Sequence, residues 1–271
     1  MIEKVNTWIN LYNSGLSIDK VARETNSTRM SIYHSLKRNG IILRDRRTFY
    51  FDENFLDNID SQEKAYFLGF LSADGFSFQN TVGIDIGIED VCLLEKFKKN
   101  FNFPQKIEYT NRNSVRIRFN SKNFVEKLKK YHIIPNKSKF HKFPEIPKVY
   151  TRHFIRGYFD GDGSIGHHKV QTEYGYRKDY IIKFIGTDLF CESLKDILKE
   201  GLNIDSSLQY IESKDKNYLY ATISFGKKSA LKKLFEYMYT ESNIYLERKY
   251  ITFLEFYKYS DNKKVKKYNK K

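Results

Sequence analysis

Apolar residues recur at helical spacing in two stretches of the chain that resemble each other. The stretches are "AYFLGFLSADGFS", residues 65–77, and "FIRGYFDGDGSIG", residues 154–166, and each predicts a helix that ends at an Asp-Gly pair. Both helices carry small residues four positions apart: Gly69 and Ala73 in the first, Gly157 and Gly161 in the second. Because such residues share a helix face and glycine costs about 1 kcal/mol inside a helix, we expect the two helices to pack closely there.

Each of these helices is followed by the same order of strand, strand, helix, strand, strand, helix. Apolar and polar residues alternate over residues 81–88 and 114–120, and again over 180–187 and 220–225, as in half-buried strands. From residue 114 onwards the first copy matches the second at an offset of 106 residues, and Asp90 is aligned with Asp188. The sequence therefore predicts an α+β fold with an internal duplication over roughly residues 61–257.

The strand alternation leaves one polar face on each predicted sheet. The candidate face residues are Ser77, Gln79, Arg116 and Arg118 in the first half, and Gln171, Arg177, Lys183, Tyr220, Thr222 and Ser224 in the second. Such a mixture suits base edges in the major groove of DNA, although an ordinary solvated face is an equal alternative for any single residue. His168, in the longer hairpin of the second half, is a further candidate for a phosphate or base contact.

Residues 5–43 contain three short helical patterns, and the second and third are separated by a tight turn at Asn26. This arrangement predicts a helix-turn-helix domain whose third helix enters the major groove. The residues expected to face DNA are Thr28, Arg29, Tyr33, His34 and Lys37. The alternative is a small helical bundle that binds a protein. Arg46 and Arg47 belong to an arginine-rich segment that we expect to follow the phosphate backbone.

The net charge of +15 and the pI near 9.5 indicate a polyanionic partner. We expect five regions: a helix-turn-helix domain (1–48), a basic linker (49–60), a first half (61–150), a second half (151–257) and a basic, disordered tail (258–271). We expect no signal peptide and no membrane-spanning segment, since the sequence has no apolar run of membrane length, and we interpret Cys92 and Cys191 as buried thiols. The expected location is the cytoplasm, and encoding in an organelle stays open.

The two Asp-Gly pairs place a carboxylate at each predicted helix C-terminus, where the helix dipole is already negative. If the helices pack in parallel, Asp74 and Asp162 converge and form a site that favours a hard divalent cation. Alone, an Asp-Gly pair would be only a helix stop. Its recurrence after the same helix favours a catalytic interpretation.

The two stretches resemble the LAGLIDADG motif of homing endonucleases. "LSADG" and "FDGDG" match its last five positions, Gly69 and Gly157 match its inner glycine, and Ser72 departs from the acid of the family pattern. The resemblance implies two αββαββα units related by a pseudo-twofold axis, with a saddle-shaped sheet that binds DNA. It also implies that Mg²⁺ or Mn²⁺ is held by Asp74 and Asp162 together with the residues before them, Ala73 and Gly161.

Each half also ends in a segment that resembles a basic element of this family near the scissile phosphates. The segments are "IIPNKSKFHKFPEIP", which contains Lys137, and "IYLERKYITF", which contains Lys249. The resemblance implies that these lysines stabilise negative charge in the transition state. Otherwise they are two surface lysines among many.

We therefore expect a monomeric, metal-dependent, site-specific DNA endonuclease with a long asymmetric target, which by the resemblance leaves short 3′ overhangs. We expect a free-standing or intron-encoded enzyme rather than an intein, because the chain opens with Met1 and ends in lysines. The alternatives are a catalytically silent transcription regulator with the same fold, and a maturase that binds intron RNA.

Overall fold

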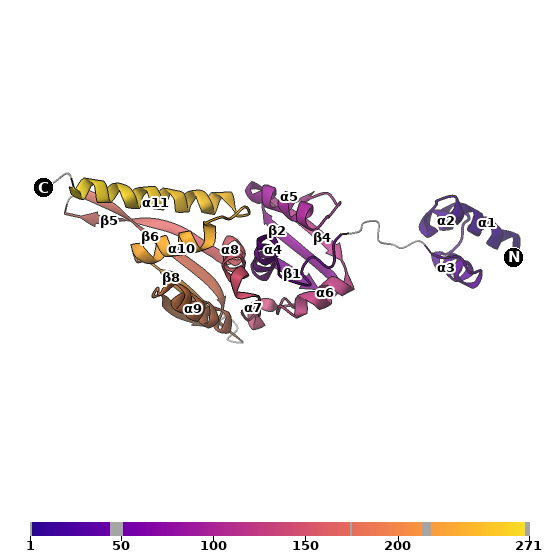
Figure 1. Cartoon of the computed structure of the whole chain (residues 1–271). Helices are drawn as coiled ribbons and strands as arrows, with labels where there is room; N and C mark the ends of the chain where they lie inside the picture. The colour runs from indigo at the N-terminus through magenta and orange to yellow at the C-terminus, as the bar shows by residue number, and fades with distance from the viewer. Residues whose placement is uncertain (1, 44–50, 174, 213–217, 269–271) are drawn as a thin grey trace. The chain divides into compact units, whose positions relative to one another are not determined.

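The structure is a computed structural model that describes residues 2–43, 51–173, 175–212 and 218–268, the last nine of them by their backbone only. The chain divides into two compact units, Met1–Phe49 and Tyr50–Lys271 (Figure 1).

The first unit consists of three helices, α1 (Ile2–Asn13), α2 (Ile18–Glu24) and α3 (Arg29–Arg38). The side chains of Ser17 and Thr28 accept hydrogen bonds from backbone amides at the starts of α2 and α3, and therefore act as N-caps. Asn26 adopts a left-handed conformation (φ 46°) in the turn between them. The buried core consists of Trp8, Tyr12, Val21, Ile32 and Leu36.

The second unit begins with the first copy of the duplicated motif. Its elements are α4 (Gln62–Ala73), β1 (Gly75–Phe78), β2 (Thr81–Gly87), the 3-10 turn η1 (Ile88–Asp90), α5 (Val91–Asn100), β3 (Glu108–Tyr109), β4 (Ser114–Asn120), α6 (Lys122–Lys129) and α7 (Lys137–Phe140). The four strands form an antiparallel sheet in the order β1-β2-β4-β3.

The second copy repeats this order with longer strands. Its elements are η2 (Lys148–Tyr150), α8 (Thr151–Asp162), β5 (Gly163–Thr172), β6 (Gly175–Thr187), α9 (Asp188–Leu202), β7 (Ser207–Glu212), β8 (Leu219–Phe225), α10 (Lys228–Tyr239) and α11 (Glu247–Tyr268). The strands pair antiparallel in the order β5-β6-β8-β7. The helices α4 and α8 lie side by side between the two sheets (Figure 1). The predicted duplicated α+β fold is confirmed.

The register of the second strand in each sheet differs by two residues from the alignment of Asp90 with Asp188. Gly75 pairs with Ile84, and Gly163 pairs with Phe184, so equivalent positions are 100 residues apart rather than 98. The difference arises because η1 separates β2 from α5, whereas α9 follows β6 directly. Equivalent residues of the two sheets are therefore those that the strand pairing relates.

Three expectations from composition differ from the structure. Residues 51–60 are not a linker, because Phe55, Leu56 and Ile59 are buried in the core of the second unit. Helix α11 continues to Tyr268, into the segment expected to be disordered. Cys92 is exposed, and only Cys191 is buried as predicted.

Candidate active site

The two motif helices contact each other through their small residues. A Cβ atom at Gly69 would lie 2.1 Å from the carbonyl oxygen of Phe154, and one at Gly157 would lie 2.0 Å from that of Tyr66. No side chain larger than hydrogen fits at such distances, so the backbones of α4 and α8 touch as expected. This contact fixes how far apart the two helix ends can be.

Asp74 and Asp162 stand at the C-terminal ends of these parallel helices. The ends are close: a Cβ atom at Gly161 would lie 2.4 Å from the Cβ of Ala73 and 3.3 Å from Oδ2 of Asp74. The predicted convergence of the two acids, one from each half, is therefore seen in the structure.

The glycines that follow the two acids stand where each motif helix passes into a strand. Gly75 and Gly163 begin β1 and β5 rather than closing the helices in a left-handed conformation, and Gly163 has φ −90°. At both positions an added Cβ would lie 2.5 Å from a backbone oxygen, that of Leu71 or Phe159. Glycine is required there because the strand leaves the helix without room for a side chain.

The pKa values of both carboxyl groups are raised above the usual value. Burial raises the pKa of Asp74 to about 6, and repulsion from Asp162 adds to this rise, against the attraction of Lys249 and Lys137. Asp162 is more exposed than Asp74, yet burial still raises its pKa, while the same two lysines lower it. Because the ionised forms of these two neighbouring carboxyl groups are disfavoured, a bound cation would stabilise them.

Lys137 and Lys249 both lie at this site, where they bind the carbonyl ends of the motif helices. Lys137 Nζ donates to the backbone oxygens of Ser72, at 2.7 Å, and of Ala73. Lys249 Nζ lies 2.6–3.1 Å from four carbonyl oxygens, those of Phe159, Asp160, Gly161 and Gly163. The two lysines thus bind equivalent carbonyls in the two halves: the carbonyl of the residue directly before each acid and that of the residue before it.

These contacts limit what the lysines can do. An ammonium group has three N–H donors, and four carbonyls surround that of Lys249, which is only 6% exposed. Burial lowers the pKa of Lys249 to about 8 and also lowers that of Lys137, against the attraction of the nearby carboxylates. The carbonyls of Ala73 and Gly161, expected to be metal ligands, are the same ones that accept from these lysines.

A buried polar network behind Asp162 was not predicted. Asp160 accepts hydrogen bonds from the hydroxyl of Tyr66 in the opposite helix and from the amide of Leu246, both at 2.7 Å. The guanidinium of Arg156 is fully buried and donates to the carbonyls of Ile244 and Met238. The sequence did contain a signal for this network, because the charged Arg156 and Asp160 stand where the first motif has Leu68 and Ser72.

The strand pairing corrects two of the predicted sheet-face residues. Ser77 pairs with Val82, so it lies on the core face and is only 7% exposed. Gln171 pairs with Tyr176 and therefore points to the opposite side from Arg177. Neither residue lies on the predicted polar face.

Gln79 lies in the exposed hairpin turn after β1, with φ 52°, rather than on a strand of the sheet. Arg116 and Arg118 lie on the polar face of the first sheet, where they form ion pairs with Asp85 and Glu108. In the second sheet one face carries His168, Arg177, Lys183, Tyr220, Thr222 and Ser224. Thr222 is the most buried of these, at 9% exposure.

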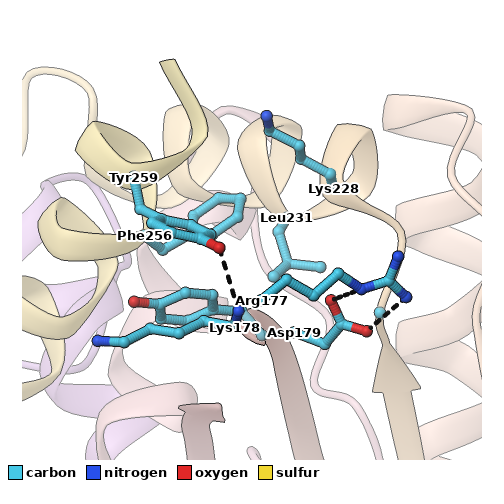
Figure 2. A pocket seen from close by; sticks show the side chains of 9 residues that line it. Arg177, Lys178, Asp179, Lys228, Leu231, Phe256 and Tyr259 are labelled. Atoms are coloured by element: carbon cyan, nitrogen blue, oxygen red, sulfur yellow. Dashed lines mark hydrogen bonds and ion pairs between the residues drawn. The ribbon is translucent and has the colours of Figure 1, made fainter. Parts of the chain in front are cut away.

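A pocket of about 210 Å³ opens where β6 runs past the end of β8, between α10 and α11 (Figure 2). Arg177 and Asp179 form an ion pair on its wall, and the amide of Lys178 donates to the hydroxyl of Tyr259 at 3.1 Å. Its lining includes neither of the two acids nor the two lysines above. The pocket is therefore separate from the candidate active site.

In the first unit, helix α3 presents the predicted DNA-facing residues unequally. Thr28 uses its hydroxyl as the N-cap, and Arg29 forms an ion pair with Asp19 at 3.3 Å. His34 and Lys37 are exposed and Tyr33 is half-buried, with Nζ of Lys37 5.5 Å from the centre of the Tyr33 ring. Arg46 and Arg47 lie outside the described residues.

The donor set at the two helix ends fits a hard cation. Asp74 and Asp162 supply carboxylate oxygens, and the backbone carbonyls beside them supply further oxygen ligands of the kind that magnesium prefers. Within the described residues no cluster of three His, Cys, Asp or Glu side chains could hold a metal ion, so a bound ion needs ligands beyond side chains.

The paired motif helices between two antiparallel sheets are the fold of the LAGLIDADG homing endonucleases. Among solved structures, the meganuclease I-AabMI bound to uncleaved DNA is 15% identical with a TM-score of 0.54, over 74% of this chain and 91% of its own. I-LtrWI bound to target DNA is 13% identical with a TM-score of 0.55, over 76% and 91%. I-SmaMI bound to an uncleaved target in the presence of calcium is 14% identical with a TM-score of 0.52, over 72% and 89%.

No family model and no curated protein matches the sequence. The likeness is therefore one of fold at low identity. Among the described residues no helix is both long and apolar enough to cross a membrane.

Proposed function

We propose that the protein is a site-specific DNA endonuclease that cuts both strands with the help of divalent metal ions. The observation that carries this proposal is the convergence of Asp74 and Asp162, one from each half, at the touching ends of α4 and α8. The fold supports it, because the solved relatives I-AabMI and I-LtrWI were determined with DNA bound.

In this proposal Asp74 and Asp162 hold Mg²⁺ or Mn²⁺ together with the carbonyl oxygens of Ala73 and Gly161. A metal ion held there would supply the activation of water and the stabilisation of charge on the leaving oxygen of the phosphodiester. The chain's own contribution is to hold the two acids at a fixed separation, because the backbones of α4 and α8 are in direct contact at Gly69 and Gly157.

The role of the lysines changes from the one that the family resemblance implied. Lys249 and Lys137 donate to carbonyls of the motif helices, so they act as positioning residues for the acids rather than as direct contacts to the scissile phosphate. Their positive charge also compensates the negative end of each helix dipole beside the acids.

Double-stranded DNA would lie across the polar faces of the two sheets. The two faces carry different side chains, so the target should be long and asymmetric. One chain carries both acids, which makes a monomer sufficient for cutting both strands. Helix α3 of the first unit would contribute a flanking contact in a major groove.

The decisive experiment incubates the protein with Mg²⁺ and a randomised DNA library and then sequences the broken ends. We expect paired breaks of constant stagger at one family of sequences, and none with EDTA or with Asp74→Asn. Enrichment of bound but uncut sequences would instead identify a transcription regulator. Retention of a structured intron RNA without any DNA cleavage would identify a maturase.

Removal of residues 1–50 tests the first unit separately. The second unit has its own core and both acids, so the truncated chain should fold and cut DNA, with a footprint shortened at one end. Up to nine basic side chains are lost, and each lost phosphate contact lowers the slope of log K against log salt by roughly 0.9. Identical footprints of the two forms would assign the first unit to a protein partner.

A further inference from the structure

Arg116 and Asp85 form an ion pair in the middle of the polar face of the first sheet. They stand directly opposite each other on β4 and β2, and their side chains are each 31% exposed. Burial disfavours the charged form of Asp85, but hydrogen bonds from Arg116 and Ser114 outweigh this and lower its pKa. The pair is therefore partly desolvated and ionised, unlike a mobile pair at the protein surface.

The hydrogen bonds leave one edge of the guanidinium available. Nε of Arg116 donates to Oδ2 of Asp85 at 2.8 Å, and Nη2 donates to the same oxygen. Within the described part of the chain no protein acceptor is recorded for Nη1. The free edge, with one N–H of Nη1 and the second N–H of Nη2, can form two parallel hydrogen bonds.

Such an edge matches one base. In the major groove only guanine presents two acceptors side by side, O6 and N7, and a bidentate arginine is the commonest way to recognise it. An unrestrained arginine could swing to a phosphate instead, but Asp85 holds Arg116 above the middle of the sheet.

We propose that Arg116 reads one guanine of the DNA target and that Asp85 is the positioning residue that holds it for this contact. The proposal rests on the proposed function, because it assumes that DNA lies on this face. It adds Asp85, which sequence reasoning had not selected, to the residues that determine specificity.

The second sheet provides an internal comparison. By the strand pairing, the equivalents of Asp85 and Arg116 are Ile185 and Thr222, which also stand opposite each other. This pair has no guanidinium, and Ile185 is 48% exposed. A guanine read by Arg116 should therefore be required in one half-site and not at the symmetry-related position of the other.

The test is a binding selection, which does not depend on cleavage. The full chain with Asp74→Asn is used to select sequences from a randomised double-stranded library in the presence of Mg²⁺. The same selection is made with Asp85→Asn, Arg116→Lys or Arg116→Ala added. Glu126→Gln serves as the matched control, because it removes the charge of a carboxylate paired with Lys129 on α6 instead of on the sheet face.

We expect one position in one half-site to prefer guanine by about 10- to 100-fold. Arg116→Ala, Arg116→Lys and Asp85→Asn should each reduce this preference to a few-fold at that position alone, while Glu126→Gln leaves it unchanged. Melting curves of each variant show whether it is folded.

Two results would overturn the inference while leaving the proposed function intact: an unchanged base profile in Asp85→Asn, or a preference lost equally at all positions. Failure of the parent chain to enrich any sequence would overturn the proposed function and this inference together.

Discussion

The two halves of the duplicated unit share one fold but support their acids differently. In the first half the motif helix has the uncharged Leu68 and Ser72 where the second half has the buried, charged Arg156 and Asp160. The carbonyls beside Asp74 are held by the half-buried Lys137. Those beside Asp162 are held by a lysine surrounded by four carbonyls.

The polar network of the second half explains this difference. Arg156 binds carbonyls of Met238 and Ile244, and Asp160 binds the amide of Leu246. These contacts anchor the segment that leads into α11, and Lys249 stands in the first turn of that helix. The comparison teaches that a duplicated backbone can keep two acids in equivalent places while their supports diverge.

The largest expected effect separates the two lysines. Lys249→Met removes a buried charge and leaves several carbonyls without a donor, so we expect a loss of about 3 to 5 kcal/mol in the free energy of unfolding. Lys137→Met removes fewer contacts and should cost about 1 to 2 kcal/mol. Denaturant titrations measure both, with the exposed Lys195→Met as control. Equal losses in the two variants would show that Lys249 and Lys137 stabilise their halves equally, against the proposed difference.

The helix contact should respond more evenly in the two halves. Gly157→Val and Gly69→Val each force a branched side chain against a backbone carbonyl of the opposite helix, with overpacking costs of about 1 to 3 kcal/mol or more. Gly201→Ala in α9 is the control, because nothing lies within 4 Å of its added Cβ and alanine favours a helix. Unchanged melting temperatures of both valine variants would show that α4 and α8 do not touch.

A smaller effect concerns pH in the metal-free protein. The pKa of Asp74 is raised in the folded state to about 6, so its contribution to stability is present below pH 4 and is lost as pH rises through 6. Wild type should lose stability relative to Asp74→Asn over that range. The pKa difference sets an upper limit of about 3 kcal/mol, and the actual loss should be smaller because the carboxylate is partly hydrated. Denaturant unfolding in EDTA from pH 4 to 7 measures this, and a relative gain would contradict the shift.

The sequence predicted the features that repeat. Two motifs with the same small residues identified the helix pair and its acids, and strand alternation identified both sheets. It could not predict which acceptors the side chains bind. Lys249 was therefore expected to stabilise the transition state, whereas it donates hydrogen bonds to helix carbonyls. It also assigned Ser77 and Gln171 to the wrong faces, because alternation alone does not say which residues stand opposite each other.

The alignment error in β6 has the same origin. Aligning Asp90 with Asp188 is reasonable for two helix starts, but η1 shifts the strand before it by two residues. Only the pairing partners reveal that Ile185, rather than Lys183, is the counterpart of Asp85.

The most direct test of the central claim, that one acid from each half forms the site, is double-strand cleavage by the single variants Asp74→Asn and Asp162→Asn. Both are assayed at saturating Mg²⁺ on the target found for the wild type, together with their affinity for that DNA. We predict that either change abolishes double-strand cleavage and leaves affinity within a small factor of wild type. Full cleavage by either variant would contradict the account.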